Sequence, residues 1–522
     1  MKKYLILFAI ATSLFVSSCG KDFLDKEKTG VLTADKKAEL LATNPAKVLD
    51  AAMAGITLNL QQYLYSNMNH NYFGQKGFDY RTSLMGNDMV MTGRFAMSLY
   101  HYLLDYRGEQ YAATANCWYQ YYDVIAQTNE VLRGIAGVDL STVSEEVKAK
   151  LTYYKAQALG YRGYAYWYLT TLYSLPYKCG APGTEWGVGG THGDDLCVPI
   201  VTENTPSDPQ PRATLSKVYE QIISDLTESY NSSKSIGKEK TADVSDFDGC
   251  VAATYLARAY MMLQNWDEAI KYSQVVMDNY GVLTTAAQLM QGFSTLSLPD
   301  VVFGCPITED NSTIYMSFFS QMDWWSKGYA GIGVWRAGFG PFVDRISATD
   351  IRKNWFLYKP GVDCHVKYQS EKFIGEGRNA ENGEGNWHLG QYIYLRSEEA
   401  YFNKAEALAH KGELNDAKAV LESVMKYRDA SYSTAALTDK ATFIEELNFQ
   451  KRVEFWGEGM EWIDNKRLNI PVDRTLATWP TNNNHYSGAR MKVGQEDILM
   501  LYQLPLKEID NNPAIGPQNQ NE

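Results

Sequence analysis

The sequence predicts a mainly α-helical protein in which tetratricopeptide-like helical hairpins form a scaffold, with long irregular loops and an insertion of small strands. Residues 250–280 and 400–424 predict the hairpins, because each places small and aromatic residues at the spacing of a repeat of about 34 residues. Residues 285–395 predict the insertion, because short β-prone runs lie there among Gly-rich loops and helical periodicity is weak.

The N-terminus predicts a lipid anchor. Lys2 and Lys3 form a positive n-region, and residues 5–16 form an apolar segment too short to span a bilayer. Small residues then precede Cys19, as in a bacterial lipobox, where the thiol is acylated. We therefore expect residues 1–18 to be a signal peptide and residues 19–45 to be a lipidated N-terminus and polar tether.

Residues 46–284 are expected to form an N-terminal helical region. Apolar periodicity predicts helices at 46–66, 111–136, 146–173 and 215–230, and Thr214 is a suitable N-cap for the last of these. Residues 67–110 are rich in Gly, Asn and aromatics, so we expect irregular structure there. Repeats of this kind bury their cores only by stacking, so the hairpins should lie side by side despite their separation in sequence.

Residues 396–522 are expected to form a C-terminal helical region and tail. Its first helix has a narrow face of small residues, Gly412 marks the turn of a hairpin, and a second helix runs to Val424. A third helix follows near Phe443, and its exit is dense in aromatics and paired charges.

Two motifs in this region resemble the SusD/RagB family of surface nutrient-binding lipoproteins from Bacteroidetes. In that family an Arg-x-x-Glu helix precedes a Glu-Phe-x-x-Glu-Gly-x-x-x-x-Asp-x-x-Arg segment. Arg396 and Glu399 match the first motif. The second is matched by Glu454, Phe455, Glu458, Gly459, Asp464 and Arg467. We expect the charged members to form buried structural ion pairs, since residues four apart share a helix face.

The resemblance implies a SusD-like fold and a location at the outer membrane, lipid-anchored and facing the cell surface. It also implies a partner, a SusC-like TonB-dependent transporter, over which the protein would sit as a lid with its helical face toward the transporter.

The amino-acid composition narrows the classes of ligand that the protein could bind. The chain has 37 Tyr and 12 Trp, and aromatics beyond core needs tend to appear at binding surfaces. Its net charge of −12 argues against nucleic acid and against an anionic membrane surface, but not against a neutral glycan.

A sugar ring needs a flat aromatic for its C–H face and polar groups for its rim. The insertion offers Trp324, Trp325 and Tyr329 close to glycines that would expose them, whereas we expect Trp335 and Trp355 to be core rings. The loop at 70–100 offers Tyr72, Asp79, Arg81 and Asp88. The resemblance points to the same two places, because ligand residues in starch-binding SusD come from loops near them, although no motif in either loop matches residue by residue.

Catalytic and cofactor motifs are missing from the sequence. It has no phosphate-binding loop, no His-Glu-x-x-His and no Gly-x-Ser-x-Gly, so we expect no cofactor. We expect no metal site either, because the cluster of His192, Asp194 and Asp195 supplies too few oxygens. Cys179 and Cys197 flank a Gly-rich loop and either form a disulfide or remain free thiols.

The sequence therefore predicts non-catalytic capture of a nutrient polymer, with a glycan or oligosaccharide as the favoured ligand. One alternative keeps the fold and binds peptides, as RagB-like members do. Another is a glycan hydrolase, which would need two carboxylates facing each other across a cleft, one with a raised pKa.

Overall fold

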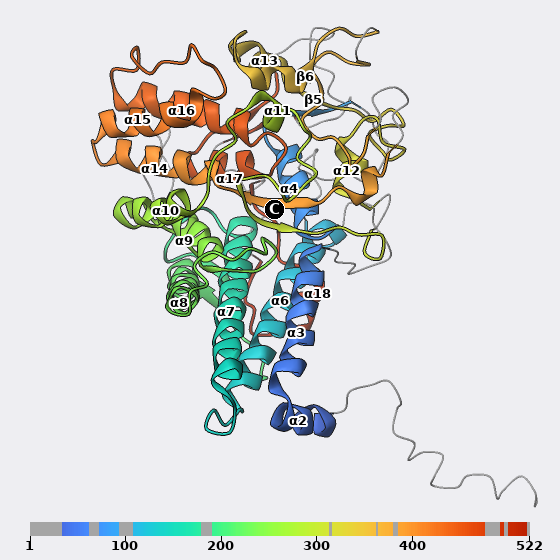
Figure 1. The fold of residues 1–522 in the computed structure, drawn as a ribbon, viewed down its shortest axis with the longest axis vertical. Coiled ribbons are helices and arrows are strands. Elements are labelled where there is room, and N and C mark those ends of the chain that lie inside the picture. Colours follow the sequence, from blue (N-terminus) through green and yellow to red (C-terminus); the bar gives the residue numbers. More distant parts are fainter. Residues whose placement is uncertain are drawn as a thin grey trace, which may run out of the picture. The chain divides into compact units, whose positions relative to one another are not determined.

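The computed structural model describes residues 34–61, 73–92, 108–178, 191–312, 316–361, 364–378, 385–475, 491–494 and 500–518. The chain divides into two compact units between Val48 and Leu49. The first unit holds α2 (Ala34–Thr43) and the start of α3 (Pro45–Gln61). All features described below belong to the second unit (Figure 1).

Eight helices of the second unit form a continuous series in which each packs against the next (Figure 1). They are α6 (Ala112–Ala136), α7 (Glu145–Tyr173), α8 (Leu215–Ser235), α9 (Gly249–Leu263), α10 (Trp266–Asn279), α14 (Glu398–His410), α15 (Leu414–Met425) and α16 (Lys440–Glu454). This arrangement confirms the mainly helical fold class. It also places the hairpin α9–α10 beside the hairpin α14–α15, as the repeat pattern predicts.

Local sequence explains where these helices begin and how closely they pack. The Thr214 side chain accepts a hydrogen bond from Lys217 N at 3.4 Å, which caps α8 as predicted. Small residues of α10 and α14, Ala269 and Ala407, share one buried cluster, so the two helices approach closely. The insertion leaves the helical series after α10 and rejoins it at α14.

The insertion contributes short strands and short helices. A four-stranded antiparallel sheet has the order β1–β5–β7–β6 and includes one strand from outside the insertion, β1. Its strands are β1 (Met89–Met91), β5 (Arg336–Gly338), β7 (Gln369–Ser370) and β6 (Phe356–Leu357). A second pair, β4 (Val301–Cys305) and β8 (Tyr392–Arg396), is also antiparallel. The insertion's helices are α11 (Ala286–Leu289), α12 (Phe318–Met322), α13 (Gly340–Arg345), η2 (Ile351–Trp355) and η3 (Trp387–Leu389).

The remaining elements are short. They are α17 (Met460–Arg467), α18 (Leu506–Asn511), the pair β2 (Leu196–Pro199) and β3 (Arg212–Thr214), and the pair β9 (Val472–Asp473) and β10 (Lys492–Val493).

The expectation of irregular structure at 67–110 is wrong for its middle part, which forms helix α4 (Gly74–Met85) and β1. Every residue of α4 is buried, and the helix packs against α17. The sequence does not indicate that this helix is buried, because many of its residues are polar and their hydrogen-bond partners lie far away in the sequence. Lys76 Nζ donates to Ile393 O at 2.7 Å, and Tyr121 Oη donates to Gln75 Oε1 at 2.9 Å. Residues 62–72 and 93–107 lie outside the described residues.

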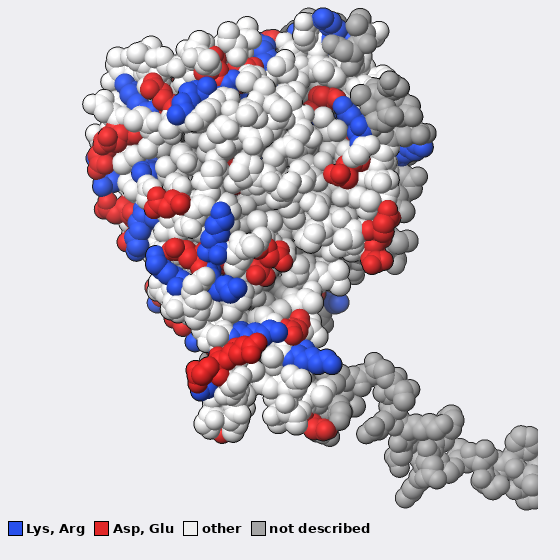
Figure 2. All heavy atoms as spheres, in the orientation of Figure 1, with Lys and Arg blue, Asp and Glu red and all other residues white. Residues whose placement is uncertain are grey.

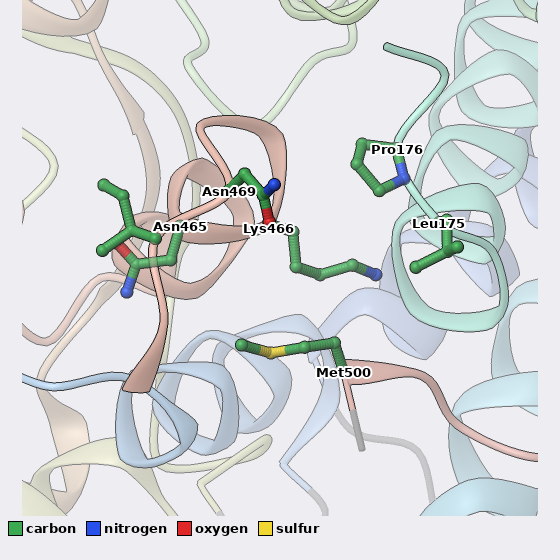
Figure 3. A pocket seen from close by; sticks show the side chains of 7 residues that line it. Leu175, Pro176, Asn465, Lys466, Asn469 and Met500 are labelled. Atoms are coloured by element: carbon green, nitrogen blue, oxygen red, sulfur yellow. The ribbon is translucent and has the colours of Figure 1, made fainter. Parts of the chain in front are cut away.

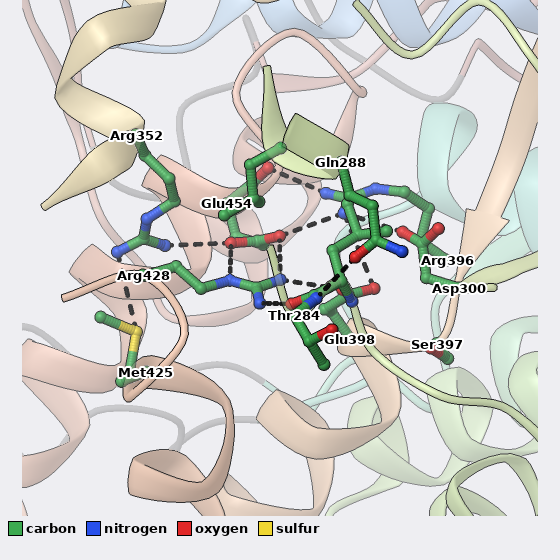
Figure 4. A network of polar contacts seen from close by, with 12 residues as sticks. Thr284, Gln288, Asp300, Arg352, Arg396, Ser397, Glu398, Met425, Arg428 and Glu454 are labelled. Carbon is green, nitrogen blue, oxygen red and sulfur yellow. Dashed lines mark hydrogen bonds and ion pairs between the residues drawn. The ribbon is translucent and has the colours of Figure 1, made fainter. Parts of the chain in front are cut away.

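Arg396 and Glu454, one charged residue from each motif, meet inside the protein, where the carboxylate of Glu454, the last residue of α16, lies at the centre of a group of buried charges (Figure 4). Three fully buried guanidiniums surround it. The nitrogens nearest to the Glu454 oxygens are Arg396 Nη1 at 3.0 Å, Arg428 Nη2 at 2.9 Å and Arg352 Nη1 at 3.1 Å. Four further acidic side chains contact these guanidiniums, those of Asp300, Asp350, Glu398 and Glu458. We call this set the Glu454 network. Burial and the neighbouring Glu398 raise the pKa of Asp300 well above its usual range, which favours its neutral form.

Opposite charges overcome the cost of burial in this network. Burial alone would raise the pKa of Glu454, yet Arg428 and Arg396 hold it well below its usual range. Burial likewise opposes ionisation of Glu458, but Arg396 and Lys372 lower its pKa to about 2. A buried charge is costly unless a partner of opposite sign lies close. The network therefore holds β8, α16 and η2 in one arrangement.

Other motif residues connect neighbouring helices. Glu399 of α14 receives two hydrogen bonds from Arg258 of α9, at 2.6 and 2.7 Å. Asp464 of α17 lies 2.9 Å from Arg467 Nη2, and the same nitrogen lies 3.0 Å from Glu406 of α14. These contacts fasten the exit segment onto the helical series.

The second motif has a glycine, Gly459, because α4 approaches the backbone closely at this position. Gly459 has φ +82°, and a Cβ atom at this position would lie 2.7 Å from the Cα of Asp79 in α4. A side chain would therefore be strained and would push α4 away from α17.

We expect the free energy of unfolding to fall as the pH drops from about 4.5 to 2. Glu458 and Asp464 both have a pKa of about 2 in the folded protein, below their ordinary values of 4.5 and 3.8. The stability that they contribute is therefore complete above those ordinary values and is lost as the pH falls through the folded ones. Urea denaturation at a series of pH values measures this loss. Glu458→Gln should give a shallower curve; a curve parallel to that of the unmodified protein would contradict the assignment.

Candidate functional site

Four rings gather in the insertion and form what we call the aromatic platform: Trp324, Trp325, Trp335 and His365. The three indoles are half-buried and the imidazole is exposed. The Trp324 and Trp325 centroids lie 4.6 Å apart with their planes tilted by 41°. His365 stacks on Trp335 at 4.6 Å and meets Trp324 edge-on at 5.5 Å. The rings therefore form one contiguous, partly solvated surface.

Regular structure holds the backbone on both sides of the platform. Trp335 directly precedes β5, and its N–H donates to Thr92 Oγ1 at 3.2 Å while its carbonyl accepts from Thr92 N at 3.2 Å. Asp323 follows α12 and closes it with a bond from its N–H to Phe319 O at 2.9 Å. Its carboxylate also accepts from Trp325 N at 3.0 Å.

Charged side chains lie beside the rings. Glu371 Oε2 accepts a hydrogen bond from the indole N–H of Trp324, and Glu371 Oε1 pairs with Arg378. Arg378 Nη1 lies 3.4 Å from Asp323 Oδ1, and its guanidinium carbon lies 5.9 Å from the centre of the Trp325 ring. Burial raises the pKa of Asp323, while Gly375 N and Arg378 favour its ionised form. Aromatic faces with adjacent fixed polar groups suit a sugar ring.

Of the residues predicted to bind ligand, the structure brings Trp324 and Trp325 into the platform. Tyr329 lies half-buried in the same loop, with its N–H directed at Ser320 Oγ at 3.3 Å. Tyr72 and the lipidation residue Cys19 lie outside the described residues.

Asp79, Arg81 and Asp88 require a correction, because their side chains are buried, with residue exposures of 6%, 1% and 2%. Asp79 accepts from Gln75 Nε2 at 2.8 Å, and burial raises its pKa to about 6. Arg81 covers the Phe78 ring at 4.1 Å, and Asp88 Oδ2 accepts from Arg452 Nε at 2.7 Å. These residues support the fold, so we remove them from the candidate ligand surface.

The expectation for the two remaining tryptophans holds for one of them. Trp355 is fully buried, and its N–H donates to Leu289 O at 2.9 Å. Trp335 is not a core ring, because it lies half-exposed just before β5, with His365 stacked on it. Sequence reasoning missed His365, Glu371 and Arg378. No local pattern marks them; the turns of the insertion bring them to the tryptophans.

The carboxylates of Glu454 and Glu458 do not form a hydrolytic pair. Both are engaged by buried guanidiniums, and Glu458 also lies 2.6 Å from Lys372 Nζ. Both have lowered pKa values, whereas a general acid needs a raised one.

Two cavities in the described residues lie away from the aromatic platform and differ from it in size and lining. One, of about 10 Å³, lies beside Lys466, whose ammonium donates to Ser174 O at 3.0 Å just beyond α7 (Figure 3). It has room for a water molecule only. A larger groove, of about 340 Å³, lies between α13 and α16 and is lined in part by Phe342, Phe449 and Arg452.

No group of three or more His, Cys, Asp or Glu within the described residues is arranged to hold a metal ion. His192 instead contacts Asp195 at 2.8 Å. Cys197 is a buried free thiol, and Cys179 lies outside the described residues. Across the described part of the chain, no helix is long and apolar enough to cross a membrane.

Comparison with known families supports the sequence resemblance. A family model described as starch-binding and associating with the outer membrane matches residues 23–261, and a model described as the SusD family matches residues 365–521. A search of curated proteins finds no match.

Solved structures share the fold. A SusD-like carbohydrate binding protein from Bacteroides vulgatus is 22% identical and has a TM-score of 0.74, over 90% of this chain and 97% of that chain. A SusD superfamily protein from Bacteroides thetaiotaomicron is 19% identical, with a TM-score of 0.72 over 91% and 100% of the two chains. Surface glycan-binding protein A from Bacteroides thetaiotaomicron, solved with laminarihexaose, is 15% identical, with a TM-score of 0.64 over 91% and 99%.

We expect Asp88→Ala to lower the free energy of unfolding by roughly 2–4 kcal/mol, because it leaves Arg452 largely buried without its carboxylate. Urea denaturation measures the effect. Glu220→Ala is the matched control, since it breaks an exposed pair with Lys217 and should change stability little. An Asp88→Ala protein of unchanged stability that bound glycan less tightly would return Asp88 to the ligand surface.

Proposed function

The chain belongs to the SusD/RagB family, and from this premise we propose that its aromatic platform captures a glycan without cleaving it. The observation that carries the proposal is the arrangement of Trp324, Trp325 and Trp335, half-exposed and in contact through His365. Indole faces stack on the C–H faces of sugar rings, and nearby polar groups fix the ring orientation.

The charge around the platform favours a neutral ligand. The Arg378 guanidinium, 5.9 Å from the centre of the Trp325 ring, is paired with both Glu371 and Asp323, so it offers no unpaired positive charge to an anionic ligand. The backbone N–H of His365 donates to Gln369 Oε1 at 2.8 Å, whereas the contacts of its imidazole among the described residues are with the Trp324 and Trp335 rings, so its two ring nitrogens remain available to sugar hydroxyls. A polymer would gain affinity by occupying several weak stacking sites along one chain.

We further propose that the protein is anchored through Cys19 in the outer membrane, faces the cell surface, and delivers its ligand to a SusC-like TonB-dependent transporter. The family description of outer-membrane association supports the location. On the face shown in Figure 2, charged side chains gather over the helical side, and a broad central area has none. Ion pairs on the helical series include Lys271–Glu268 at 2.8 Å within α10 and Lys411–Asp267 at 2.7 Å between the end of α14 and α10. We propose that the helical face is the one that meets the transporter.

We expect soluble protein beginning at Gly20 to be retarded in native gels that contain one of a panel of neutral glycans, without release of reducing ends. Trp324→Ala and Trp325→Ala should each weaken this binding about tenfold or more, because each removes a stacking face. Tyr358→Ala is the control, since this residue is 58% exposed and its ring contacts Lys359.

The other outcomes identify the alternatives. Release of reducing ends would show a hydrolase and overturn the non-catalytic proposal. Binding to peptides with no response to any glycan would favour RagB-like peptide capture. Equal losses in Tyr358→Ala and the tryptophan variants would remove the platform as the binding site.

A further inference from the structure

We propose that Glu371 is a positioning residue that fixes the tilt between Trp324 and Trp325 and so prepares the platform for its ligand. The inference deepens the proposed function and rests on it for the ligand readout. The geometric part, that Glu371 sets the orientation of the two rings, is independent of any ligand.

The backbone of Glu371 is anchored in the core. The residue follows β7, and its N–H donates to the carbonyl of fully buried Trp355 at 2.8 Å. Its neighbour Lys372 directs its side chain inward, where Nζ donates to Glu454 O and Trp456 O, each at 2.8 Å. Successive side chains of an extended segment point to opposite sides. The Glu454 network therefore holds this segment with Glu371 facing the platform.

The carboxylate of Glu371 completes a closed chain of contacts that connects the two rings. One oxygen accepts the indole N–H of Trp324, and the other binds Arg378. Arg378 reaches Asp323 at 3.4 Å, and Asp323 accepts from Trp325 N at 3.0 Å. The chain of contacts closes through the ring contact between Trp325 and Trp324 at 4.6 Å. Glu371 is thus the link between the Trp324 indole and the residues that hold Trp325.

This link matters because Trp324 is half-exposed and core packing restrains only part of its ring. Without an acceptor for its N–H, the indole keeps only its packing and its ring contacts with Trp325 and His365, so its orientation is less restrained and a ligand must order it on binding. A side chain that is already held in its bound orientation avoids that entropy cost. Glu371 therefore acts on affinity through Trp324 and not through the ligand.

The test begins with near-ultraviolet circular dichroism, because two indoles at fixed distance and tilt couple their transitions. Trp325→Phe identifies the signal of this pair among the 12 Trp residues of the chain. We expect Glu371→Ala to diminish the same signal, and to add nothing further in the Trp325→Phe background. Glu371→Gln keeps an oxygen acceptor for the Trp324 N–H, so it should retain most of the signal.

The variants that lose the circular dichroism signal of the Trp324–Trp325 pair should also lose glycan affinity. We expect Glu371→Ala to weaken binding of the glycan that retards the unmodified protein about fivefold, the cost of ordering one side chain, and Glu371→Gln to restore most of it. Glu376→Ala is the matched control, an exposed carboxylate five residues further along the same loop. Thermal unfolding of each variant shows that it is folded.

Two results would overturn the proposal: an unchanged spectrum in Glu371→Ala, or a loss of affinity with an unchanged spectrum, which would make Glu371 a direct ligand contact. Failure of the proposed function is distinguishable from both. In that case no glycan binds the unmodified protein, while the spectral change in Glu371→Ala still establishes the positioning role.

Discussion

The structure depends on neutralising the charges that meet at the carboxylate of Glu454. Arg396, Arg428 and Arg352 reach it from three parts of the chain, and all four side chains are fully buried. Removing one partner would leave an uncompensated charge in the interior, which is far more costly than the loss of an exposed pair. The elements that carry these residues are therefore fixed relative to one another, even though η2 lies within the insertion and α16 lies beyond it in the sequence.

The same network reaches the platform through the pair Glu371–Lys372. Lys372 is held by Glu454 O, Trp456 O and Glu458, and the adjacent Glu371 faces outward to Trp324. A loop-borne binding surface is usually more mobile than the scaffold beneath it. Under our proposal, the residue that orients the half-exposed Trp324 ring is one position away from Lys372, which is buried and ion-paired, so the platform gains rigidity from the core.

Much of the fold was predictable from the sequence, and the reasons lie in local patterns. Helical periodicity and the cap at Thr214 located the helices of the series, and the Arg396 and Glu454 motifs indicated the family. The candidate site was harder to predict from the sequence. Asp79, Arg81 and Asp88 resembled a polar binding loop, but in the fold they are buried against Gln75, Phe78 and Arg452. Asp79 and Arg81 belong to α4, a helix whose many polar residues hide its apolar periodicity in the sequence. Conversely, His365, Glu371 and Arg378 acquire meaning only when the turns of the insertion bring them to Trp324, Trp325 and Trp335, and no spacing in the sequence records that approach.

The most direct test of the central claim is a crystal structure of the soluble protein with the oligosaccharide that binds it most tightly. The account predicts a sugar ring stacked on Trp324, Trp325 or Trp335, an intact glycosidic bond, and Glu371 still bonded to the Trp324 indole. An oligosaccharide bound elsewhere, with the platform empty, would contradict the assignment of the site. A cleaved oligosaccharide would contradict its non-catalytic role.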